Sequence, residues 1–140
     1  MTNSDMARGY LSQAVEILAE AERLYHAQVW NLVVRRSQEV IEFALKAALR
    51  FVGLEIPRLH DVGVLLMEHR NKFPLPFGKE IDRLASISRR ARREREISFY
   101  GDDEIGVPPQ QLYREPDACV ALEDARFVLK CCRDVMGKQE

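Results

Sequence analysis

Apolar residues recur at intervals of three or four positions along every long segment of this chain, which is the period of an amphipathic helix. No segment alternates apolar and polar residues over the length of a strand. The first predicted helix begins at an N-cap around Asn3 to Asp5 and ends in a short break near residues 26–28. Its apolar stripe consists of Tyr10, Ala14, Ile17, Leu18, Ala21, Leu24 and Tyr25.

The second predicted helix, residues 30–51, has an apolar face broad enough to contact two neighbouring helices. Gly53 suits the position that follows a helix C-cap, and Pro57 prevents the helix from continuing. The apolar face comprises Trp30, Val33, Val34, Val40, Ile41, Ala44, Leu45, Ala48 and Phe51.

The remainder of the chain predicts three more helices. Asp61 can cap a short third helix, and the sequence Phe-Pro-Leu-Pro at residues 73–76 then interrupts the chain. A fourth helix begins at about Gly78, and residues 101–114 form a loop before the last helix, which accepts Pro116 in its first turn. This order predicts an all-α fold, an antiparallel up-down bundle of four long helices plus one short helix.

Length and composition favour one globular domain spanning residues 1–140, with 46% hydrophobic and 31% charged residues. The net charge is −1, so any attraction to nucleic acid or membrane must be local. No apolar run approaches the roughly 20 residues that span a bilayer, and the N-terminus lacks the build of a signal peptide, so we expect a cytoplasmic protein without membrane partners. Cys119, Cys131 and Cys132 show no C-x-x-C spacing and are expected to be buried free thiols.

Residues 89–103, R-R-A-R-R-E-R-E-I-S-F-Y-G-D-D, form the most unusual stretch of the chain. Seven helical positions separate Arg93 from Tyr100, so both side chains lie about 20° apart on one stripe of an ideal helix. Together they can hold a phosphate or a nucleotide, because arginine gives a planar fork of donors and tyrosine a stacking face. The alternative is a solvated basic helix end tied to neighbouring acids. The five arginines are Arg89, Arg90, Arg92, Arg93 and Arg95.

Other kinds of chemistry find little support in the sequence. His26, His60 and His69 lack metal-ligand spacing, and no serine lies in a G-x-S-x-G turn. The glycines are scattered, so no phosphate-binding loop is expected, and we expect neither metal nor cofactor. The acid pair Asp102 and Asp103 is either solvated or neutralises the arginines in the absence of a ligand.

Three segments together resemble the HEPN domain, whose name stands for higher eukaryotes and prokaryotes nucleotide-binding. They are W-N-L-V-V-R-R-S-Q-E-V-I-E-F-A-L-K-A-A-L-R-F-V-G in the second helix, then L-H-D-V-G-V-L-L, then an arginine helix that ends in Y-G-D. The resemblance covers nearly the whole chain. It implies a homodimer with the arginine segments near the interface, and a small nucleotidyltransferase partner, often in a toxin–antitoxin pair. The apolar face of the second helix is broader than one neighbour covers, which also favours a homodimer.

The same resemblance implies a motif for metal-independent ribonuclease activity. In active relatives an arginine is followed, after four to six residues, by a histidine, and one branch adds a tyrosine two residues further on. These positions fall on Arg93, Ser98 and Tyr100, so serine replaces the residue expected to transfer protons near neutral pH. The motif is therefore degenerate, and Ser98→His should raise cleavage if the ring reaches Arg93. On a straight helix Ser98 points about 140° away from Arg93.

The favoured interpretation is a dimeric HEPN-like protein that binds nucleotide or RNA and acts with a nucleotidyltransferase partner. Arg93 would hold phosphate, Arg89 and Arg90 would widen the basic rim, and Tyr100 would stack on a base or accept a nucleotidyl group. One alternative is a weak metal-independent endoribonuclease, and another is a non-catalytic helical dimer that serves as an adaptor. A nucleotidyltransferase gene beside this one would favour the first interpretation over the last.

Overall fold

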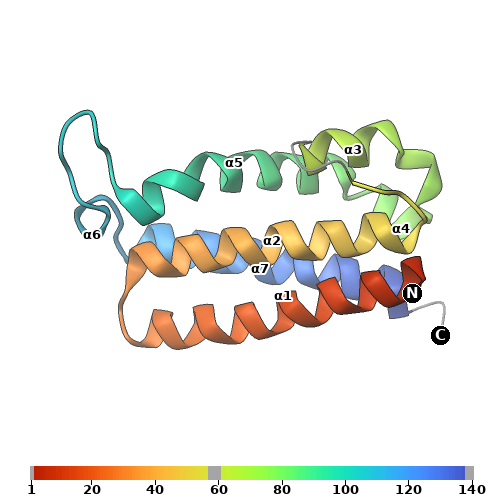
Figure 1. Ribbon diagram of the computed structural model, residues 1–140, viewed down its shortest axis with the longest axis horizontal. Coiled ribbons are helices and arrows are strands. Elements are labelled where there is room, and N and C mark those ends of the chain that lie inside the picture. Colours follow the sequence, from red (N-terminus) through yellow and green to blue (C-terminus); the bar gives the residue numbers. More distant parts are fainter. Residues whose placement is uncertain (1, 57–60, 138–140) are drawn as a thin grey trace.

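The computed structural model describes residues 2–56 and 61–137, which form one bundle of helices (Figure 1). No strand occurs within these two ranges, and the predicted all-α bundle of four long helices plus a short one is confirmed. Single-turn helices also occur in two of the segments that connect these helices. The long helices are α1 (Asn3–His26), α2 (Trp30–Phe51), α5 (Ile81–Tyr100) and α7 (Glu115–Gly137), and the short elements are α3 (Val62–Glu68), the 3-10 turn η1 (Arg70–Lys72), α4 (Leu75–Gly78) and α6 (Pro109–Leu112).

Consecutive long helices run in opposite directions along the bundle (Figure 1). The turn between α1 and α2 therefore lies at the same end as the loop that joins α5 to α6. The N-terminus and the end of α7 lie at the opposite end. The C-terminal part of the arginine-rich helix α5 is thus brought beside the first turns of α2, although some 60 residues separate them in the chain.

Helix boundaries follow the capping signals of the sequence, with small shifts. The N-cap of α1 is Thr2, one residue before the predicted range, because Thr2 and Asp5 form a reciprocal capping box. Gly53 follows the C-cap of α2 with a φ of 91°, as predicted, whereas Pro57 lies outside the described residues. The Asp61 side chain caps α3 by accepting from the backbone N–H of Gly63 at 2.9 Å. The predicted start of the fourth helix near Gly78 belongs instead to α4, and α5 begins at Ile81.

The core is built around α2, which contacts α1, α5 and α7. The broad apolar face predicted for this helix is therefore covered by three helices of the same chain rather than by two neighbours. A homodimer would need a different surface, so the breadth of this face does not support one. Each long helix turns only part of its circumference inwards, and none of the described helices has an apolar stretch long enough to cross a bilayer. The large side chains that are fully buried in the core include Leu45, Leu49, Leu66, Ile81, Leu84 and Ile87.

Small residues let the helices approach closely at two contacts. Ala7, Ala14 and Ala21 recur every seventh position of α1, and all three are completely buried. Gly63 of α3 lies so close to Ala85 of α5 that an added Cβ would be 3.2 Å from the Ala85 Cα. The second contact fixes α3 along the first part of α5 and leaves the C-terminal part of α5 uncovered by α3 (Figure 1).

The three cysteines are free thiols, but they differ in burial. Cys132 is completely buried, and burial raises the pKa of its thiol well above the usual value. The expectation of a buried free thiol is thus confirmed for Cys132, whereas Cys119 and Cys131 are only half-buried.

Candidate functional site

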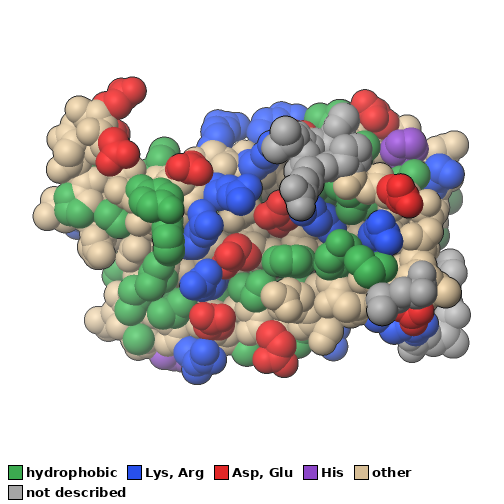
Figure 2. Space-filling model, in the orientation of Figure 1, with side chains coloured by type: hydrophobic (Ala, Val, Ile, Leu, Met, Phe, Trp, Pro, Cys, Tyr) green, Lys and Arg blue, Asp and Glu red, His purple; other side chains and the backbone are tan. Residues whose placement is uncertain are grey.

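The outer surface of α5 carries the candidate anion-binding residues. This helix continues without interruption from Ile81 to Tyr100, so residues seven positions apart return to the same side. Arg89, Arg93 and Tyr100 are exposed, and Tyr100 retains 62% of its accessible surface. Basic side chains gather over the middle of α5 on the face seen in Figure 2. We call Arg89, Arg93 and Tyr100 the outer stripe.

The five arginines fall into two groups according to their partners. Arg90 forms an ion pair with Asp124 of α7 at 3.2 Å, and Arg92 lies 3.7 Å from the Asp61 carboxylate at the start of α3. These two guanidinium groups tie α5 to its neighbours. Arg89, Arg93 and Arg95 make no side-chain hydrogen bond or ion pair with any residue in the described ranges. Their donors are therefore available to an external anion, and Arg90 has a structural contact that the sequence did not indicate.

The acids that follow α5 do not neutralise the arginines. Asp102 instead accepts hydrogen bonds from the backbone N–H groups of Glu104 at 3.1 Å and Ile105 at 3.4 Å. Its own backbone pairs with Val107 in both directions. Asp102 thus shapes the projecting loop between α5 and α6, which carries acidic side chains near its tip (Figure 2).

Ser98 occupies a position inside the bundle, away from the outer stripe. Its side chain is completely buried, and the hydroxyl donates to the carbonyl oxygen of Glu94 one turn earlier. The Asn31 amide of α2 donates to the Ser98 carbonyl oxygen at 3.2 Å, so this side of α5 faces α2. The structure therefore brings Arg93 and Tyr100 onto one side of the helix and does not bring Ser98 to them.

Two polar residues of α2 hold the C-terminal part of α5 in place. Asn31 satisfies the Ser98 carbonyl, one of the acceptors that a helix end leaves without an intrahelical partner. Arg35 donates to the Arg95 carbonyl oxygen, and its guanidinium lies 4.9 Å from the centre of the Phe99 ring. A positive charge is favourable there because the helix dipole places partial negative charge at its C-terminus. The sequence did not predict these roles for Asn31 and Arg35, because neither residue belongs to a recognisable motif.

Gly101 is required where α5 ends. Its φ is 81°, in the left-handed region that glycine adopts freely. A Cβ at this position would lie 2.3 Å from the Val107 carbonyl oxygen. The chain therefore leaves the helix at Tyr100 in a fixed direction, and the exposed phenol stands at the base of the projecting loop.

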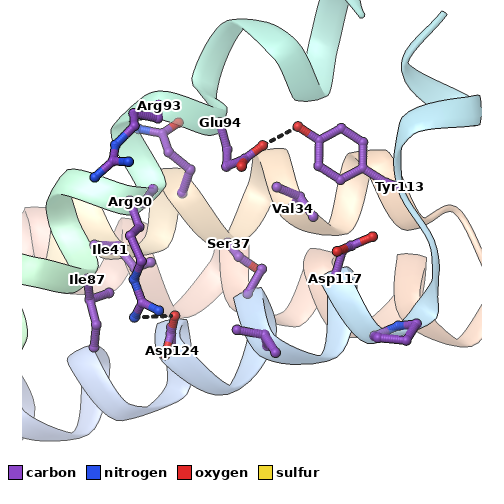
Figure 3. Close-up of a pocket in the computed structure, with 15 residues that line it drawn as sticks. Val34, Ser37, Ile41, Ile87, Arg90, Arg93, Glu94, Tyr113, Asp117 and Asp124 are labelled. Carbon is purple, nitrogen blue, oxygen red and sulfur yellow. Dashed lines mark hydrogen bonds and ion pairs between the residues drawn. The ribbon is translucent and has the colours of Figure 1, made fainter.

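A cavity of about 490 Å³ lies beside the outer stripe, between α2, α5 and α7 (Figure 3). Arg90, Arg93 and Glu94 of α5 form one wall, and Asp117 and Asp124 of α7 form the opposite wall. Apolar side chains, including Val34, Ile41 and Ile87, complete the lining. Of these residues the sequence predicted a site role only for Arg90 and Arg93, because the cavity forms where α2, α5 and α7, which are distant in the sequence, come together.

Polar contacts define the two ends of this cavity. The Tyr113 hydroxyl donates to the Glu94 carboxylate at one end, and burial together with this bond raises the pKa of Tyr113 above its ordinary range (Figure 3). At the other end burial raises the pKa of Asp124, an effect that the guanidinium of Arg90 opposes. Between them Ser37 of α2 is completely buried, and its hydroxyl makes no hydrogen bond with any described residue.

Within residues 2–56 and 61–137, no three His, Cys, Asp or Glu side chains are grouped so that they could bind a metal ion. His26 ends α1 and His69 follows α3, at opposite ends of the bundle (Figure 1), and His60 lies outside the described residues.

The geometry defines an all-α bundle with an arginine-bearing helix beside a cavity, and comparison with known proteins assigns the bundle to a family. A family model described as the HEPN domain matches residues 7–135, so the chain belongs to the HEPN family. The crystal structure of an archaeal HEPN homologue is 24% identical and superimposes with a TM-score of 0.65, covering 93% of this chain and 97% of that one. None of the curated proteins compared with the chain matches it.

Proposed function

We propose that this HEPN protein binds nucleotide or RNA phosphate on the outer stripe and acts with a small nucleotidyltransferase, as in some toxin–antitoxin pairs. Arg93 and Arg89 contact phosphate, and Tyr100 stacks on a base or accepts a nucleotidyl group from the partner enzyme. Arg90 widens the basic rim while it remains paired with Asp124. The protein is not an efficient ribonuclease by itself, because serine stands at the histidine position of the motif.

One observation carries this proposal: Arg89 and Arg93 lie one helical turn apart on an exposed surface without an acidic partner among the described residues. Two other arginines of this run do have acidic partners, since Arg92 lies 3.7 Å from the Asp61 carboxylate and Arg90 3.2 Å from that of Asp124. Two guanidinium groups without partners can donate to a phosphate, and the exposed phenol about two turns after Arg93 on the same helix offers a stacking face for a base.

Binding of a short single-stranded RNA should weaken linearly on a logarithmic plot as salt concentration rises. The reason is that arginine–phosphate contacts release the counterions condensed on the RNA. Fluorescence anisotropy of a labelled oligonucleotide, measured between low and physiological salt, would record this slope. Absence of binding even at low salt would contradict the proposal and would favour the adaptor interpretation.

A homodimer is part of the proposal, and the protein at tens of micromolar should therefore scatter light with twice the mass of one chain. The apolar face of α2 is used within the chain, so the interface must lie on another surface, and we place it along α5. Substituting the exposed Ile97 by aspartate should then shift the scattering mass towards the monomer, whereas the same change at the exposed Val15 of α1 should not. A wild-type monomer would remove the dimer from the proposal.

A further inference from the structure

The cavity between α2, α5 and α7 contains polar groups that the phosphate contacts of the outer stripe do not use. Ser37 points into the space between α5 and α7 in Figure 3. A buried hydroxyl without a hydrogen-bond partner is destabilising relative to one that has a partner. Such a group in a cavity is a reason to look for a ligand that would satisfy it.

The polar lining of this cavity is rich in acceptors. Glu94, Asp117 and Asp124 each contribute a carboxylate, which accepts hydrogen bonds and donates none while ionised. Each carboxylate retains free lone pairs beyond its existing hydrogen bonds. Glu94 accepts from the Tyr113 hydroxyl, Asp124 accepts from one guanidinium, and Asp117 accepts from a backbone N–H at 2.9 Å. The same lining also contains donors: Arg93 is assigned to phosphate, Gln38 donates to Glu42 at 3.3 Å, and Arg90 pairs with Asp124 at the other end of the cavity. At the end formed by Glu94 and Asp117, a ligand group that donates hydrogen bonds is therefore favoured over one that only accepts them (Figure 3).

The remaining surface of the cavity fits a flat heterocycle. Val34, Ile41 and Ile87 supply apolar contact, and a volume of about 490 Å³ falls within the usual range of small-molecule sites. Arg93 belongs both to this lining and to the outer stripe. A base in the cavity would therefore extend directly from a phosphate bound at Arg93.

We propose that this cavity is a nucleobase pocket selective for bases with an exocyclic amino group, with Ser37 and the acidic wall reading that group. This inference rests on the proposed function, because Arg93 supplies the phosphate contact for the same ligand. Aspartate and glutamate accept from the amino group of cytosine in the same way when proteins read bases directly. A keto oxygen at that position would instead face carboxylate oxygens and be repelled.

Two pairs of nucleotides test the selectivity, since each pair differs in essentially one substituent of the ring. Cytidine monophosphate should bind at least about tenfold more tightly than uridine monophosphate, and adenosine monophosphate than inosine monophosphate, by calorimetric titration. Ribose 5-phosphate, which lacks the base, should bind about as weakly as uridine monophosphate. Equal affinities within both pairs would overturn the inference.

Variants separate the pocket from the phosphate site. Ala121 lines the cavity, so Ala121→Leu should abolish the difference within each pair and leave ribose 5-phosphate binding unchanged. Ala19→Leu, on the exposed side of α1, is the matched control and should change nothing. If nucleotides bind through Arg93 but Ala121→Leu has no effect, the pocket is wrong while the proposed function stands. If no phosphate compound binds at all, both are wrong.

Ser37→Ala distinguishes a serine that binds the ligand from one that only supports the fold, because stability and affinity should change differently. The hydroxyl has no partner among the described residues, so its removal should leave the thermal midpoint of the free protein unchanged or raise it. The same variant should bind cytidine monophosphate several-fold more weakly. A lower midpoint with unchanged affinity would show that Ser37 serves the fold and not the ligand, and would count against the pocket.

Discussion

Replacing Arg89 and Arg93 together by alanine should weaken binding of RNA or nucleotides by about 100-fold or more. Each guanidinium–phosphate contact is typically worth roughly 1.5–3 kcal/mol, and tenfold in affinity corresponds to about 1.4 kcal/mol. Both side chains are exposed and lack acidic partners in the described chain, so their loss should leave the unfolding midpoint nearly unchanged. Titration and thermal unfolding of the same samples would separate binding from stability.

The control for this experiment removes the same number of charges from other parts of the surface. Arg8 lies on α1 and Arg133 on α7, and both are exposed. Their double alanine variant should bind within about twofold of wild type at physiological salt, where charges beyond roughly 8 Å are largely screened. Equal losses in the two double variants would mean that net charge, rather than the outer stripe, attracts the ligand.

The sequence predicted the fold well because the fold depends on local signals. Hydrophobic periodicity, helix caps and helix-breaking residues are each determined by residues close together in the sequence. The helix ends at Gly53 and Asp61 could therefore be predicted directly, and the cap at Thr2 to within one residue. The inward faces followed in the same way, since Leu45 lies on the apolar face predicted for the second helix and is completely buried. The small error at Gly78 arose because two prolines start a separate turn, α4, before α5 begins.

The site was less accessible to sequence reasoning because it depends on contacts between distant segments. The periodicity of a single helix was enough to place Arg93 and Tyr100 on one stripe. No local pattern could show that Asp124 would pair with Arg90, or that Ser37 and Tyr113 would face the same cavity as Arg93. The width of an apolar face also did not reveal how many helices of the same chain would pack against α2. For this reason the face was interpreted as favouring a dimer.

Position 98 shows how a motif alignment and a structure can lead to different experiments. The resemblance to active relatives suggested that a histidine there would restore proton transfer beside Arg93. Ser98 is instead completely buried against α2, and its carbonyl is held by Asn31. A histidine ring at this position would have to displace packed side chains before it could reach the outer stripe.

Ser98→His should therefore lower the free energy of unfolding by roughly 2–4 kcal/mol and should not create ribonuclease activity. Overpacking a filled core typically costs 1–3 kcal/mol, and a buried ring nitrogen without a partner adds a similar penalty. Denaturant unfolding would measure the loss, and an RNA cleavage assay in the presence of a metal chelator would measure activity. Ser98→Ala, which removes only the hydroxyl, should cost about 1 kcal/mol or less.

The informative comparison is with a histidine placed where the geometry allows it to act. Glu96 is exposed and lies three residues after Arg93, so Glu96→His directs its ring towards the outer stripe without entering the core. This variant should be as stable as wild type within about 0.5 kcal/mol, and any gain in cleavage should appear in it rather than in Ser98→His. If Ser98→His instead folds normally and cleaves RNA in a manner that depends on Arg93, then α5 must bend near its end to bring both residues together. The buried position of Ser98 would then describe only the resting form of the helix.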